Sequence, residues 1–213
     1  MTPSLLVHDG GLWVVNKPAG WAAHPQGDSA IPDVLSWARE SAGAPQSIAP
    51  IHRLDRATSG LILLSDDETL RASLGAELAA GNVRKRYRAL VHGRTHAKGI
   101  VRRRLEDRRR GKPVDAVTRF TRRAVYGRVS LLDVRPETGR RHQIRRHFSG
   151  LGHHVVGDER YGPRRPPSVP GFPGRMWLHA LALELPDGRR FEAPLPEELQ
   201  THLALLSERF PER

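Results

Sequence analysis

The sequence of 213 residues contains no cysteine, which excludes disulfide bonds and thiolate metal sites. It also lacks any apolar run near the roughly 18 residues that a membrane-spanning helix needs. The first residues have neither the basic segment nor the long apolar segment of an export signal. We therefore expect a cytoplasmic protein with no membrane partner.

Acidic residues are scarce relative to basic ones. The 35 lysines and arginines exceed the 23 aspartates and glutamates by 12, and the isoelectric point is about 11.2. Such an excess favours a polyanionic partner, and nucleic acid is favoured over membrane because no basic amphipathic helix is present. Only four of the cations are lysines. Because arginine binds phosphates and stacks on bases, the composition suits RNA. A genome rich in arginine codons would explain the choice of arginine but not the net excess.

The length suits one domain, residues 1–213, and no repeat or long linker divides it. Hydrophobic periodicity predicts strands at 12–15, 61–64, 83–92, 116–121 and 129–134, and a hairpin formed by 176–185 and 189–193. It predicts helices at 32–40, 66–80 and 140–151 and a terminal helix with Leu199, Leu203, Leu206 and Phe210 on its buried face. The sum is a strand-rich α+β fold.

The passage from Ile51 to Gly60 places Asp55 in a turn directly before an apolar strand. A carboxylate held rigidly in such a turn suits a nucleophile or a base. Arg53 and Arg56 flank it, and a nearby cation keeps a carboxylate ionised. The alternative is an ordinary turn in which Asp55 caps backbone amides, and the pattern alone does not separate the two.

A second basic passage runs from Glu137 to His147. On the predicted helix, Arg145 lies off the core face formed by Ile144, Phe148 and Leu151, so we expect it to point into a cleft. Arginines near a helix start would also bind phosphate. The alternative is a solvated basic face.

Together these passages resemble the RluA-type pseudouridine synthases, a family that modifies tRNA and large-subunit rRNA without a guide. The resemblance covers nearly the whole chain in the family's order. Its blocks are Val15-Asn16-Lys17-Pro18-Ala19-Gly20 with His24-Pro25, His52-Arg53-Leu54-Asp55 with Thr58-Ser59-Gly60, Lys85-Arg86-Tyr87, Thr138-Gly139-Arg140 through His142-Gln143-Ile144-Arg145, Gly157-Asp158, and more weakly Leu178-His179-Ala180.

The resemblance implies an α+β catalytic core with a mixed, mainly antiparallel sheet, flanking helices and an active-site cleft across the sheet. It implies an isomerase that converts a uridine in RNA to pseudouridine, with no cofactor and no metal. Asp55 corresponds to the catalytic aspartate, Tyr87 to the tyrosine beside the target base, and Arg145 to the basic residue that pairs with the aspartate. Arg53 corresponds to the arginine that enters the space left by the extruded uridine.

The remaining residues of the two motifs are expected to contact RNA. They are His52, Arg56, Arg140, His142 and Gln143. A further basic loop, with arginines at 102–104 and 108–110 and a lysine at 112, offers more RNA contacts. The alternative for this loop is a solvated segment that touches no RNA.

Motif details such as Gly20-Trp21 and Arg145-Arg146-His147 look most like the tRNA-modifying, TruC-like branch. We therefore expect a tRNA substrate, with large-subunit rRNA as the alternative. We also expect a monomer with no separate N-terminal RNA-binding module. His153-His154 stands where the family usually reads His-Pro, and residues 161–174 form a loop rich in proline and arginine that the motifs do not explain.

Two other classes of protein compete with this interpretation. A metal-dependent hydrolase would use histidines such as His142, His147, His153 and His154, but no carboxylate stands at metal-ligand spacing from them on the predicted helix. A non-catalytic RNA-binding protein of the same fold would be expected to have lost Asp55, Tyr87 or Arg145, and all three are present.

Overall fold

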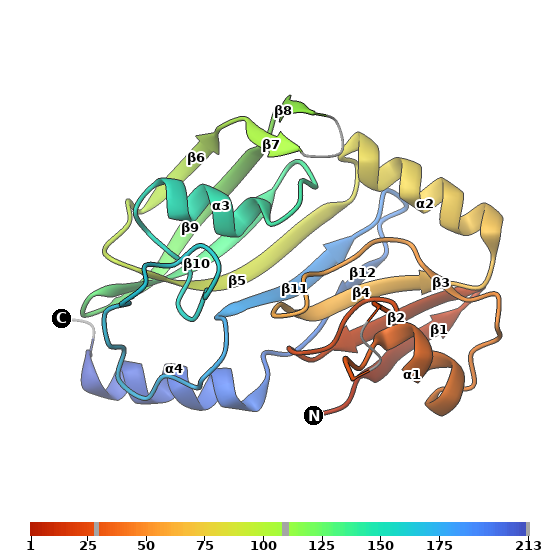
Figure 1. The fold of residues 1–213 in the computed structure, drawn as a ribbon, viewed down its shortest axis with the longest axis horizontal. Coiled ribbons are helices and arrows are strands. Elements are labelled where there is room, and N and C mark those ends of the chain that lie inside the picture. The colour runs from red at the N-terminus through yellow and green to blue at the C-terminus, as the bar shows by residue number, and fades with distance from the viewer. Residues whose placement is uncertain (28–29, 108–110, 212–213) are drawn as a thin grey trace. The chain divides into compact units, whose positions relative to one another are not determined.

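The computed structural model describes residues 1–27, 30–107 and 111–211 (Figure 1). The chain forms two compact units. Unit 1 is Met1–Arg84 with Ala180–Pro194, and unit 2 is Lys85–His179 with Leu195–Arg213. Each unit combines antiparallel strand pairs with helices, which confirms the α+β class. No helix in the described ranges is long and apolar enough to cross a membrane.

Unit 1 is a sheet with a helix packed on its hydrophobic face. Its strands follow the order β1 (Ser4–Asp9), β2 (Leu12–Lys17), β4 (Ser59–Ser65) and β11 (Leu178–Glu184, in this unit from Ala180), while β3 (Ala49–Pro50) pairs with β4 and β12 (Arg190–Glu192) with β11. Val14 lies opposite Leu63 in the β2–β4 register, and both are fully buried. They pack with Leu74 of α2 (Glu68–Ala80) in one apolar cluster.

Side-chain caps set where the two helices of unit 1 begin. The carboxylate of Asp33 accepts from the Ser36 N–H before α1 (Val34–Ser41), and that of Asp67 accepts from the Thr69 and Leu70 N–H groups before α2. Capping satisfies amides that have no partner in the first turn of a helix. Both helices therefore begin two residues later than the sequence pattern predicted.

Unit 2 is a four-stranded antiparallel sheet with a helix on each face. The strand order is β5 (Arg84–His92, in this unit from Lys85), β10 (Val129–Pro136), β9 (Val117–Tyr126) and β6 (Lys98–Arg102). Helix α3 (Gln143–Gly150) packs on one face through the edge-to-face pair Phe120–Phe148. Helix α4 (Glu197–Arg209) covers part of the opposite face, where its Leu199 and Leu206 join Leu90 and Leu131 in one cluster.

Three predictions for unit 2 are corrected by the structure. The helix predicted at 140–151 begins only at Gln143, because His142 adopts a left-handed conformation with φ 53°. Leu151, predicted to lie on the core face of that helix, is 47% exposed. The basic loop contains a small hairpin of β7 (Leu105–Asp107) and β8 (Lys112–Val114), and its arginines at 108–110 lie outside the described residues.

The proline- and arginine-rich loop, unexplained by the motifs, is fastened to α4. Val169 is buried in the cluster under that helix, and His202 Nε2 donates to the Pro170 carbonyl over 2.9 Å. His202 Nδ1 accepts from the Trp177 indole over 3.0 Å. With one nitrogen donating and the other accepting, the ring is neutral, and burial lowers the pKa of His202 accordingly.

Gly60, in the same motif as Asp55, marks a close approach of two strands of unit 1. Its φ of 111° lies in a region that side chains disfavour, and a Cβ atom there would lie 2.2 Å from the Ala180 carbonyl oxygen. The motif therefore contains glycine at this position for a packing reason.

We predict that Gly60→Ala lowers the free energy of unfolding by about 2–4 kcal/mol, because it adds a backbone clash to an unfavourable φ. Urea unfolding followed by circular dichroism measures this. Gly188→Ala is the matched control, since Gly188 has a φ of 88° but open space around its Cβ position. Equal losses in the two variants would show that the contact with Ala180 contributes nothing.

Candidate active site

The Asp55 turn is anchored in unit 1 on both sides. Leu54 is buried, and the Thr58 N–H donates to the Asp55 carbonyl over 3.0 Å, which closes the turn. On the other side, the Leu63 N–H of β4 donates to His52 Nε2 over 3.2 Å. His52 therefore fastens the motif to the strand that follows it. Asp55 itself is half-buried.

A buried lysine holds the backbone of the Asp55 turn through hydrogen bonds. Lys17 is fully buried, and its ammonium donates to the carbonyls of Pro18, Trp21 and Arg56 over 2.9–3.2 Å. The Gly20 N–H donates to the same Arg56 carbonyl over 2.8 Å. These bonds join the Asn-Lys-Pro-Ala-Gly block to the Asp55 turn and offset the cost of burying the charge. The motif that contains Lys17 did not by itself predict this supporting role.

The arginines beside Asp55 point to solvent. Arg53 and Arg56 are both exposed, although the backbone of Arg56 is bound by Lys17 and Gly20. Exposed side chains on a fixed backbone suit contact with a ligand. Their contact with RNA, like that of His52, stays a prediction.

In unit 2 the guanidinium of Arg145 is held by Asp158. Arg145 Nε and Nη2 donate to the two carboxylate oxygens over 2.8 and 2.7 Å, and the side chains are 8% and 0% exposed. Burial opposes ionisation of Asp158, but the bonds and charge of Arg145 and the N–H groups of Tyr161 and Arg160 outweigh it and hold the pKa of Asp158 below its ordinary value. The pair is therefore ionised at neutral pH.

This pairing bears on the predicted partner of Arg145. The two bonds use two of the five donors of the guanidinium, so binding to Asp158 does not exclude a second acidic partner. Pairing of Arg145 with Asp55 stays a prediction. The Gly157-Asp158 block did not by itself predict the contact of Asp158 with Arg145.

Tyr161, which the sequence reasoning missed, lies against the same guanidinium. Its ring centroid is 5.1 Å from Arg145 Cζ, within range of a cation–π contact, and its hydroxyl is 2.8 Å from His142 Nδ1. Among the described residues, His142 is the non-glycine residue with a positive φ. The contact between Tyr161 and His142 therefore lies at a point where the backbone is strained. Tyr161 thus joins the segment after Asp158 to the start of α3.

Gln143 has all four hydrogen-bonding positions of its amide occupied inside unit 2. Its Oε1 accepts from the Thr138 hydroxyl and the Arg140 N–H, and its Nε2 donates to the Val117 carbonyl and the Thr118 hydroxyl. Gln143 is also buried. These bonds give it a structural role, fixing the segment from Thr138 to α3 on strand β9. RNA contact by Gln143 and by the half-buried Arg140 stays a prediction.

The histidines considered as metal ligands are bound in structural contacts. His147 Nε2 donates to the Arg103 carbonyl and Nδ1 accepts from Thr118, and burial lowers its pKa, so the ring is neutral. His153 and His154 donate through Nδ1 to the carbonyls of His92 and Tyr161. In the described part of the chain, no three histidine, aspartate or glutamate side chains cluster as metal ligands.

Tyr87 and Lys85 lie on the α3 face of the sheet, with Tyr87 opposite Val134 of β10. The Lys85 ammonium lies 3.7 Å from the position of a Cβ atom on Gly139, which belongs to the second motif. Burial lowers the pKa of Lys85. Unit 2 therefore brings the Lys-Arg-Tyr block and the second motif together on one face.

A family model of RNA pseudouridylate synthases matches residues 11–150, which include Asp55, Tyr87 and Arg145. The chain belongs to this family. The match covers well over half of the 213 residues.

Relatives of the RNA pseudouridylate synthase family agree with the assignment. An "Uncharacterized RNA pseudouridine synthase" of Chloroflexus aurantiacus is 37% identical over 91% of the chain and 66% of that protein. "Ribosomal large subunit pseudouridine synthase C" of Escherichia coli is 33% identical over 95% and 69%, and synthase D of Zymomonas mobilis is 33% identical over 74% and 55%. The chain thus spans between about half and 70% of the length of these relatives.

Solved structures support the fold of this family. The chain matches "Human RNA Pseudouridylate Synthase Domain Containing 4" with a TM-score of 0.77 and 24% identity, over 95% of this chain and 92% of that one. It matches "Human RNA Pseudouridylate Synthase Domain Containing 1" with a TM-score of 0.72 and 23% identity, over 99% of this chain and 97% of that one. The expected pseudouridine synthase-like fold is therefore confirmed.

We predict that Asp158→Asn lowers the free energy of unfolding at pH 7 by about 3–5 kcal/mol, because it leaves the Arg145 charge buried without its counter-ion. Since the folded-state pKa of Asp158 is depressed, the carboxylate stabilises above its ordinary pKa and this contribution is lost as pH falls below about 4. Urea unfolding between pH 3 and 7 measures the difference in the free energy of unfolding between variant and wild type.

Glu184→Gln is the matched control. This substitution breaks an ion pair inside unit 1 between Glu184, whose side chain is 39% exposed, and Arg84, whose side chain is 80% exposed. It should lower the free energy of unfolding by less than about 1 kcal/mol. If the two variants lose equal stability, or if the difference for Asp158→Asn does not change with pH, the buried pair does not have the role given to it here.

Proposed function

We propose that this chain is an RNA pseudouridine synthase that isomerises a specific uridine within a folded RNA. The observation that carries the proposal is the match to the family model across residues 11–150 with Asp55, Tyr87 and Arg145 all present. The net charge of +12 supports a polyanionic substrate. A chain that only bound RNA would not need the three together.

The reaction demands positioning more than reactive chemistry. The bond from ribose C1′ to uracil N1 breaks, the base rotates, and a bond from C1′ to C5 forms. C5 loses its proton and N1 ends protonated, so atoms balance with no oxidant or reductant. The enzyme must hold a detached base in an enclosed pocket while it turns.

In this proposal Asp55 is the group that allows the glycosidic bond to break and to form again. Attack on the sugar, attack on the base and removal of a sugar proton all require Asp55 as an ionised carboxylate on a fixed backbone. The bonds of Lys17 and Gly20 to the Arg56 carbonyl support such a fixed position. Arg145 supplies positive charge to the carboxylate, and Asp158 orients it as a positioning residue.

A uridine stacked in an RNA stem must leave the stem before it reacts. Extrusion costs a few kcal/mol, and a side chain that fills the gap offsets part of that cost. We propose that Arg53 fills it, since Arg53 is exposed beside the Asp55 turn. Tyr87 is proposed to pack against the extruded base.

Two classes of RNA are candidates for the substrate. The details of the motifs favour a stem uridine of tRNA. The names of relatives such as "Ribosomal large subunit pseudouridine synthase C" of Escherichia coli favour large-subunit rRNA as the second candidate.

We predict that Asp55→Asn abolishes tritium release from C5-labelled uridine in RNA, because the amide supplies no negative charge to the reaction. The wild type should release tritium, and RNA binding should be retained by the variant. Asp9→Asn is the matched control, since Asp9 is an exposed carboxylate at the end of β1. Tritium release by Asp55→Asn would show that Asp55 does not have the catalytic role proposed for it. If the wild type binds RNA but releases no tritium, the chain would be an RNA-binding protein without this activity.

We predict that a strain lacking this protein loses pseudouridine at one or a few positions of its tRNA. Pseudouridine mapping of total tRNA and of rRNA measures this, with wild-type protein restored as the control. Loss in large-subunit rRNA alone would support the second candidate. An unchanged map in both classes, despite restored expression in the control, would contradict the proposed function.

A further inference from the structure

One face of the unit 2 sheet changes from apolar to charged side chains along its strands. Under α4 this face is apolar, with Leu90 of β5 opposite Leu131 of β10. Two and four residues further along β10, the same face carries Asp133 and Arg135. The face lies opposite α3 and is therefore separated by the sheet from Tyr87 and Arg145 of the same unit.

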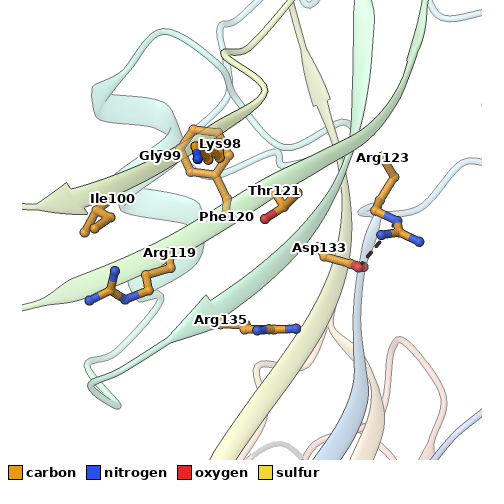
Figure 2. Close-up of a pocket in the computed structure, with 9 residues that line it drawn as sticks. All are labelled: Lys98, Gly99, Ile100, Arg119, Phe120, Thr121, Arg123, Asp133 and Arg135. Carbon is orange, nitrogen blue, oxygen red and sulfur yellow. Dashed lines mark ion pairs between the residues drawn. The ribbon is translucent and has the colours of Figure 1, made fainter.

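The charged end of this face is hollowed. A pocket of about 410 Å³ opens over strands β6, β9 and β10, and its cations are Lys98, Arg119, Arg123 and Arg135 (Figure 2). Among the residues that line it, Asp133 is the one acid. We call this surface the basic sheet face. Its four cations against one carboxylate leave a local charge of +3.

The neighbouring acids do not neutralise this charge. Asp133 lies 2.8 Å from Arg88 Nε and 3.6 Å from Arg123 Nε, so two cations share it, and Arg119 is paired with Glu137. Counting Arg88 and Glu137 as well gives five cations and two acids, again +3. Lys98 and Arg135 form no ion pair within the described ranges.

The strand register makes the arrangement costly for the fold. Arg119 of β9 lies directly opposite Arg135 of β10. Like charges directly opposite each other across two strands are destabilising. An anion bound between them would offset the repulsion, whereas a purely structural face would gain from replacing Arg135, which, unlike Arg119, forms no ion pair within the described ranges.

We propose that the basic sheet face binds the sugar–phosphate backbone of the substrate RNA at phosphates away from the target uridine. This inference rests on the proposed function, which makes RNA the partner. Arginine donates two parallel hydrogen bonds to a phosphate, and Thr121 adds a hydroxyl among the cations. Ile100, 41% exposed beside them, offers an apolar surface for a ribose.

The test replaces three of these cations at once, in Lys98→Gln/Arg123→Gln/Arg135→Gln. The matched control, Arg189→Gln/Arg190→Gln/Arg209→Gln, removes three exposed cations elsewhere. Binding to a tRNA transcript and to a large-subunit rRNA fragment is measured by filter binding from 50 to 300 mM salt. Single-turnover pseudouridine formation at saturating RNA is measured on the same proteins.

We expect the triple variant to bind the substrate RNA at least about 10-fold more weakly at 0.1 M salt, and its salt slope to fall by about 2–3. The single-turnover rate at saturating RNA should stay that of the wild type, because this face does not touch the reacting nucleotide. The charge-conserving variant Lys98→Arg/Arg123→Lys/Arg135→Lys should retain most of the affinity. Binding by the control should change less than about twofold.

A single variant separates binding from folding. Arg135→Glu places opposite charges across the two strands, so it should melt no lower than the wild type and yet bind RNA more weakly. Wild-type affinity and salt slope in the triple variant and in Arg135→Glu would overturn the inference, as would an equal loss in the control. If the wild type forms no pseudouridine but the triple variant still loses RNA affinity, the proposed function fails and the basic sheet face stands.

Discussion

The buried ion pair between Arg145 and Asp158 is the interaction on which the rest of the candidate site in unit 2 depends. A guanidinium inside a protein needs a counter-ion, and Asp158 supplies one with two short hydrogen bonds. Tyr161 then lies against the guanidinium and binds His142 at the start of α3. The position of the arginine that the proposed chemistry uses is thus set by a carboxylate outside the residues matched by the family model.

Unit 1 meets a related constraint by a different route. The proposed catalytic carboxylate lies in a turn, and turns move unless their backbone is bound. Here a fully buried lysine, Lys17, binds three carbonyls, one of them that of Arg56 next to Asp55. Gly60 fixes the other end of the motif through its contact with Ala180. The motifs therefore combine residues for chemistry with residues that hold them still.

Much of the fold could be predicted from the sequence, because the buried strands read as apolar runs and the helices show apolar periodicity, with aspartates at the start of α2. The start of α3 could not, since a left-handed histidine at 142 breaks a pattern that continues on both sides. Asp158 and Tyr161 were missed as parts of the site because their roles come from contacts 13 to 19 residues away. The basic sheet face was missed for a similar reason: three strands bring its cations together, and their sequence spacing shows no motif.

We propose that one RNA is held in two ways, by phosphate contacts on the basic sheet face and by a single extruded uridine at the proposed catalytic residues. An experimental structure of the full chain bound to its substrate RNA tests the central claim most directly. We predict that the extruded uridine contacts Tyr87 and that the Asp55 carboxylate lies within about 3.5 Å of a reacting atom of the nucleotide. A bound RNA whose target uridine stays stacked in its helix, or lies far from Asp55, would contradict it.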